Sequence, residues 1–181
     1  MSGDPRRSRA ADLVEPILGF RQWRLRDSGL WSPFSEVLWA SVELRARCAR
    51  GRHEHADTPA KSCACGIYAH YDPCARTAAA GTREFVSGVV AVWGRVELHA
   101  TGLRASHARI VALERPPFPG ARRGRLAGVA ERLGVPAVRR RDLAVVASEH
   151  GAPLAAALRP PSEWTHMDAC LAVVERLRSV S

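Results

Sequence analysis

The sequence lacks any long uninterrupted run of apolar residues. The clearest short run, Val89-Val90-Ala91-Val92-Trp93, is far too short to cross a bilayer as a helix. Residues 1–11 are polar and carry arginine, and the continuous apolar stretch that a secretory signal requires does not follow them. We therefore expect a cytoplasmic protein that has no membrane partner.

Lysine is almost absent, since Lys61 is the only one among the 27 basic residues and arginine supplies the rest. A net charge of +9 would ordinarily suggest nucleic-acid binding. Arginine in place of lysine, beside abundant alanine, is also what codon bias in a GC-rich genome produces, whatever the protein binds. The charge is therefore weak evidence. An unknown protein partner is expected first, and nucleic acid bound through arginines second.

Disulfides are not expected, because cysteines in a reducing compartment usually bind metal, react as thiols or pack in the core. The chain has five cysteines among 181 residues, and it is 46% apolar and 25% charged. That composition is ordinary for a globular protein, and the length is sufficient to bury a core without a disulfide scaffold.

The order of the expected elements predicts an α+β fold. A small antiparallel β-sheet with a Cys/His zinc loop comes first, and a C-terminal helical part follows. Residues 1–11 are expected to be a disordered arm and residues 12–181 a single domain. Within that domain, residues 12–115 form the zinc-bearing β-rich part and residues 121–181 the helical part.

The clearest strand covers residues 85–98, which are rich in β-branched residues, with Gly88 and Gly94 at bends or bulges. After a turn at Thr101-Gly102, a strand over 108–113 returns, and residues 16–25 extend this hairpin with a bulge between Phe20 and Trp23. Residues 34–48 suit a strand or a helix. Helices are expected over 73–80, over 125–133, from 142 to Gly151, and over 162–177.

The strongest chemical signal is a group of cysteines and histidines in one polar segment. Four of the five cysteines fall between Cys48 and Cys74, together with three histidines. Thiolate and imidazole are the ligands of structural zinc. The predicted ligands are Cys48, His55, Cys63 and Cys65, with His53 as the alternative to His55 and with His70 and Cys74 in reserve. The competing interpretation is that these are free cysteines in a loop.

A catalytic zinc would need an open coordination position and an acid or base beside it. The chain has neither a His-Glu-x-x-His motif nor the deaminase signature, so a structural zinc is favoured and no catalytic residue is assigned. The resulting hypothesis is a zinc-stabilised, non-enzymatic binding or accessory module. An alternative is an enzyme or small-ligand-binding protein whose pocket near the hairpin uses His99, Arg104 or His107. A second alternative is a DNA-binding regulator in which Arg139, Arg140 and Arg141 approach phosphate.

Three segments together resemble a family of small actinobacterial proteins of unknown function. They are Gly19-Phe20-Arg21-x-Trp23-Arg24-Leu25, Cys63-x-Cys65-Gly66-Ile67-Tyr68-Ala69, and Val89-x-x-x-Trp93-Gly94-x-Val96. The resemblance covers roughly residues 16–113. It implies the same Cys/His site here, with the histidine offset, so that either His55 or His53 is the ligand. It implies no activity.

Overall fold

The computed structural model describes residues 10–27, 29–48, 50–52, 58–60, 63–73 and 84–160. His53, His55, Cys74, the helix expected over 162–177 and nearly all of the helix expected over 73–80 lie outside these residues. No helix in the described part of the chain is long and apolar enough to span a membrane.

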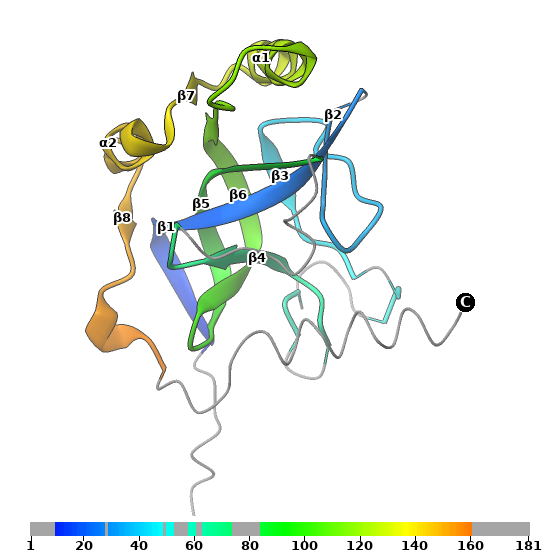
Figure 1. The fold of residues 1–181 in the computed structure, drawn as a ribbon. Coiled ribbons are helices and arrows are strands. Elements are labelled where there is room, and N and C mark those ends of the chain that lie inside the picture. Colours follow the sequence, from blue (N-terminus) through cyan, green and yellow to red (C-terminus); the bar gives the residue numbers. More distant parts are fainter. Residues whose placement is uncertain are drawn as a thin grey trace, which may run out of the picture.

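Three long antiparallel strands form the centre of the fold: β1 (Ala10–Arg26), β5 (Phe85–Leu98) and β6 (Gly102–Glu114). β5 lies between the other two and pairs with both. The short β4 (Ile67–His70) pairs with β6 and also with β1, where Phe20 lies opposite His70. The strands β1, β5, β6 and β4 therefore follow one another in a closed ring (Figure 1).

Four short strands extend this ring at its edges. β2 (Gly29–Trp31) pairs with β1, and β3 (Glu43–Arg45) pairs with β6, both antiparallel. Two later strands add parallel pairs: β7 (Ala137–Val138) on β6 and β8 (Ala152–Pro153) on β1. The predicted antiparallel sheet is thus confirmed, and it is the larger part of the described fold.

The strand predicted over residues 85–98 is confirmed with those bounds. It pairs with β6 as the predicted hairpin, although β6 begins at Gly102, earlier than the expected residue 108. Gly94 has φ +76 and lies where the β5–β6 register slips between Trp93 and Val96, as a bulge requires. Most buried apolar side chains form one core cluster, whose fully buried members include Trp23, Leu103, Ile110 and Leu126.

The helices lie at one end of the sheet, beyond the end of β6 (Figure 1). α1 (Ala121–Leu133) buries Leu126, Val129 and Ala130, and Gly134 ends it in the left-handed conformation, as predicted. α2 (Leu143–Ser148) is shorter than expected and follows a 3-10 turn at Arg140–Asp142. A second 3-10 turn occupies Ala156–Leu158. Leu143 and Ala147 of α2 pack in a second core cluster with side chains of β5 and β6.

The described residues of the C-terminal part are less helical than the sequence predicts. Both β7 and β8 join the sheet, because the edges of β6 and β1 offer backbone groups that the passing chain can pair with. The Leu113 N–H donates to the Pro136 carbonyl at 2.9 Å, and the Arg115 N–H donates to the Val138 carbonyl at 2.7 Å. The part after residue 120 is therefore joined to the sheet.

Two expectations about the first strand are wrong in detail. β1 begins at Ala10, inside the predicted disordered arm, because β5 continues far enough to pair its Glu97 with Ala10. No bulge falls between Phe20 and Trp23; the register instead slips between Leu13 and Ile17. The segment 34–48, left open between strand and helix, contains only the short β3 and an isolated bridge at Leu38.

Candidate metal centre

Two short strands bring the cysteines together by pairing with the same long strand. β3 ends at Arg45 opposite His107 of β6, and β4 begins at Ile67 opposite Ala105. Because these positions on β6 are nearly adjacent, the segment after β3 and the segment before β4 meet. Cys48 lies in the first segment, and Cys63 and Cys65 lie in the second.

The three cysteines form a cluster with the spacing of a metal site. Their Sγ atoms all lie within 4.8 Å of one another. The Cys48 and Cys63 Sγ atoms are 3.8 Å apart, and no disulfide joins any two of the three cysteines. Zn–S bonds of about 2.3 Å at tetrahedral angles place two sulfurs about 3.8 Å apart. Cys48, Cys63 and Cys65 are therefore close enough to hold a metal ion.

The thiols lie in a partly shielded environment. Cys65 is buried, and Cys48 and Cys63 are half-buried. Burial raises the pKa of the Cys63 thiol; a backbone hydrogen bond from Cys65 acts against this rise, and side-chain hydrogen bonds with Cys65 and Cys48 add to it. The backbone N–H of Ala60 points at the Cys65 Sγ, with an N–S distance of 3.4 Å.

Arg104 of β6 holds the cysteine segment in place by hydrogen bonds to its backbone. Its guanidinium donates to the carbonyls of Cys63, of Cys65 at 3.1 Å and of Ala60 at 3.0 Å. The same group pairs with Glu97 of β5, whose carboxylate lies 2.6 Å from Nη2 and 3.1 Å from Nε. Arg104 and Glu97 are both buried. One buried ion pair therefore orients the backbone that carries two of the cysteines.

Glycine is required at the residue after Cys65. Gly66 has φ +127, which residues with a Cβ rarely adopt. A Cβ there would also lie 3.1 Å from the Pro59 Cβ and 3.3 Å from the Arg104 Cβ. The Tyr68 hydroxyl adds a bond to the Ala64 carbonyl at 2.8 Å, and this bond closes the turn between Cys63 and Cys65. The sequence Cys63-Ala64-Cys65-Gly66 is thus fixed by several contacts besides any metal.

The predicted ligand-binding residues lie in two different surroundings. Arg104 is committed to Glu97 and to the cysteine segment, and the His99 Nε2 lies 3.6 Å from the other Glu97 oxygen. His107 instead stacks on Trp93. The sequence suggested Arg104 as a ligand-binding residue but not as a support of the cysteine segment, and Glu97 was not identified as its partner. The available signal was their position in facing strands of a predicted hairpin, where opposite charges pair.

Comparisons with protein-family models, with curated proteins and with solved structures found no match to this chain. The class that its fold and site define is a mostly antiparallel β protein, with two short helices after the main strands and a three-cysteine cluster able to hold a metal ion.

Proposed function

We propose that the three cysteines bind one structural zinc ion and that His55 supplies the fourth ligand, with His53 as the alternative. The observation that carries this proposal is the mutual approach of the Cys48, Cys63 and Cys65 Sγ atoms within 4.8 Å. Both histidines lie between Cys48 and Cys63 in the sequence, in the segment that the cluster closes. The resemblance to the actinobacterial family supports the same ligand set.

Zinc suits this donor set better than a hard cation does. Thiolates are soft ligands, whereas magnesium and calcium prefer carboxylate, carbonyl and water oxygens. Three thiolates and one imidazole would complete a tetrahedron and leave no position for a substrate. The metal would then stabilise the protein by joining the end of β3 to the start of β4.

The function that this arrangement supports best is a non-enzymatic binding or accessory module. A metal ion would hold the segment between β3 and β4 rigid, and a rigid segment offers a partner a fixed surface to bind. The alternative, an enzyme or small-ligand-binding protein, named His99, Arg104 or His107. Of these, Arg104 has its polar atoms committed to Glu97 and to three backbone carbonyls.

The first test is the zinc content of the purified protein and of Cys63→Ser, measured by elemental mass spectrometry. We expect about one zinc per chain in the parent, and in the variant no zinc and a lower unfolding midpoint. Cys74→Ser serves as the matched control and should keep the metal. A parent protein free of metal, with Cys63→Ser equally stable, would falsify the proposal.

The fourth ligand is tested by replacing zinc with cobalt(II). Sulfur-to-cobalt charge-transfer absorption reports the thiolates, and the visible d–d bands report tetrahedral geometry. His55→Ala should weaken cobalt binding and alter the d–d bands, while His53→Ala leaves both unchanged. The reverse result would assign His53 instead. Unchanged spectra in both variants would exclude each of these histidines as the ligand.

A further inference from the structure

Three strands place an aromatic ring, an imidazole and a guanidinium in one row. Trp93 of β5 lies opposite His107 of β6, and His107 lies opposite Arg45 of β3. The Trp93 and His107 rings are stacked, with centroids 5.7 Å apart and an interplanar angle of 17°. Both rings are half-buried and Arg45 is exposed, so part of this row is open to a ligand.

The bulge in β5 fixes the orientation of these rings. Gly94, at φ +76, leaves no room for a Cβ, which would lie 2.4 Å from the Ser106 Oγ and 2.9 Å from the His107 Nδ1. The Ser106 hydroxyl lies 2.9 Å from the His107 Nδ1 and accepts the Arg95 backbone N–H at 3.0 Å. Ser106 therefore holds the imidazole against Trp93, and the row is pre-organised. Bulges often aim side chains in this way at functional sites.

Exposed arginines surround the row. Arg45 and Arg47 flank the buried Ala46, and Arg109 follows two residues after His107 on β6. Neither these arginines nor the exposed Arg50 and Arg52 near Cys48 form an ion pair with any residue that the structure describes. Glu43 of β3 lies opposite Arg109.

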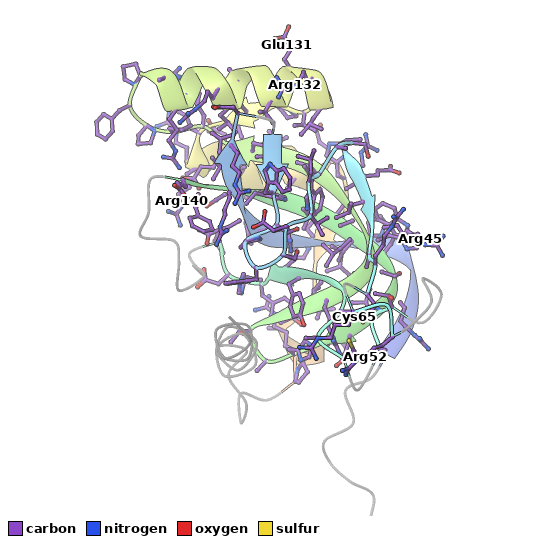
Figure 2. All side chains as sticks on the ribbon, turned by 90° about the vertical axis from the view of Figure 1, so that its right-hand side faces the viewer. Arg45, Arg52, Cys65, Glu131, Arg132 and Arg140 are labelled. Carbon is purple, nitrogen blue, oxygen red and sulfur yellow. The ribbon has the colours of Figure 1, made fainter. Side chains whose placement is uncertain are left out.

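This basic region is separate from the arginines of the helical end. Figure 2 shows Arg45 and Arg52 on the side of the molecule that carries Cys65, whereas Arg132 of α1 and Arg140 lie away from it. Arg140 donates to the Pro73 carbonyl, and Arg141 lies 3.6 Å from Asp142, so two arginines of the 139–141 run have partners. Beside the cysteines, stacked rings lie next to arginines that form no ion pair with any described residue.

We propose that the Trp93–His107–Arg45 row and the neighbouring Arg47 and Arg109 bind single-stranded nucleic acid. Bases stack on aromatic faces without regard to sequence, and arginines meet the phosphates between them. A duplex hides its base faces, so the stacked rings argue for a single strand. The inference rests on the proposed zinc site, because Cys48 lies three residues after Arg45 and the metal would fix the segment that carries these arginines.

The test measures fluorescence anisotropy of labelled oligothymidylate and oligouridylate, each of about 15 nucleotides. The two probes distinguish a DNA partner from an RNA partner. Trp93→Leu should weaken binding roughly 5- to 150-fold, the range seen when one stacking residue is lost. Trp93→Phe keeps an aromatic face and should restore most of the affinity.

The charge contribution is tested by Arg45→Gln and Arg109→Gln, both at exposed positions where a surface substitution should change stability by about 0.5 kcal/mol or less. The affinity falls with salt, and each substitution should make the slope of log affinity against log salt less steep by about 0.7, the value for one phosphate contact on a single strand. Arg132→Gln removes the same charge from the exposed face of α1 and should leave the slope unchanged.

The inference is overturned if the zinc-loaded protein binds neither oligonucleotide at roughly 50 mM salt, even if it binds vesicles of anionic lipid. It is equally overturned if Trp93→Leu binds as tightly as the parent, if Arg132→Gln matches Arg45→Gln, or if duplex binds as well as single strand. Zinc content is measured on the same samples. Zinc-loaded protein without binding refutes this inference alone, whereas protein without zinc refutes the proposed metal site.

Discussion

Arg104 is the residue on which the candidate metal centre most depends besides the cysteines. Its guanidinium joins a carboxylate on β5 to the carbonyls of Ala60, Cys63 and Cys65. A buried ion pair gains little over an apolar pair, but removing one partner leaves the other charged and without compensation. The pair thus positions the cysteine backbone, and replacing either Arg104 or Glu97 alone should destabilise the protein.

Arg104→Gln should therefore lower the free energy of unfolding by about 3–5 kcal/mol, since Glu97 would stay buried without its cation. The measurement is urea denaturation followed by tryptophan fluorescence. Arg125→Gln is the matched control, because its pair with Asp27 has side chains 51% and 90% exposed and should change stability by about 0.5 kcal/mol or less. Equal effects of the two substitutions would contradict the role given to Arg104.

Tyr71 gives a prediction about alkaline pH. Burial raises the pKa of Tyr71 to about 12, although Arg159, 4.6 Å from its ring centroid, acts in the opposite direction. The unfolded tyrosine ionises near pH 10, so between about pH 10 and 12 the unfolded state binds fewer protons than the folded state. The stability that neutral Tyr71 provides is thus present below about pH 10 and lost as pH rises toward 12.

Tyr71→Phe should accordingly lose less stability than the parent between about pH 10 and 12, measured as the change in urea midpoint. Burial also lowers the pKa of Arg21 to about 10, but that group is common to both proteins and cancels in the difference. Parallel pH profiles for parent and variant would show that Tyr71 does not titrate as described.

Among the elements, β5 and α1 each contain a glycine, and the two glycines have different surroundings. Gly94 lies in the bulge that aims Trp93 and His107, and it needs both its positive φ and the absence of a Cβ. Gly124 lies in α1, and a Cβ there would meet nothing within 4 Å. The same substitution should therefore have opposite effects at the two positions.

Gly94→Ala should destabilise the protein by about 1–3 kcal/mol, the cost of a strained backbone position. Gly124→Ala should stabilise it by about 0.5–1 kcal/mol, because alanine loses less backbone entropy in a helix. Thermal unfolding of both variants beside the parent measures the two signs. A neutral Gly94→Ala would mean that the bulge relaxes, and the orientation given to His107 would then be lost.

The elements that the sequence predicted well are those with local signals. The apolar, β-branched run of residues 85–98 and the apolar spacing of α1 before Gly134 depend only on near neighbours. The meeting of three cysteines followed from residue chemistry. In contrast, Arg21 is a charged residue at a buried position, so the pattern of apolar and polar residues did not show which face of β1 it lies on. The short strands β7 and β8 could not be predicted locally, because their partners β6 and β1 are distant in the sequence.

At the scale of the whole molecule, the ring of strands and the cysteine segment are held by different means. The ring encloses its own apolar core, which includes Trp23, Val90 and Ile110. The segment between β3 and β4 is attached by the short pairings of those strands with β6, by Arg104 and, we propose, by zinc. Losing the metal should therefore open this segment and leave the ring folded.

Trypsin is suited to test this separation, because Arg47, Arg50, Arg52 and Lys61 all lie between β3 and β4. The zinc-loaded protein should resist cleavage at these sites, and a strong chelator should make them the first to be cut. Amide hydrogens of β5 and β6 should stay protected from exchange in the same chelated sample, because the core of the ring does not involve the metal. If β5 and β6 lose protection together with the segment, the zinc supports the whole fold. If chelation changes neither readout, the segment is held by Arg104 and its neighbours without metal.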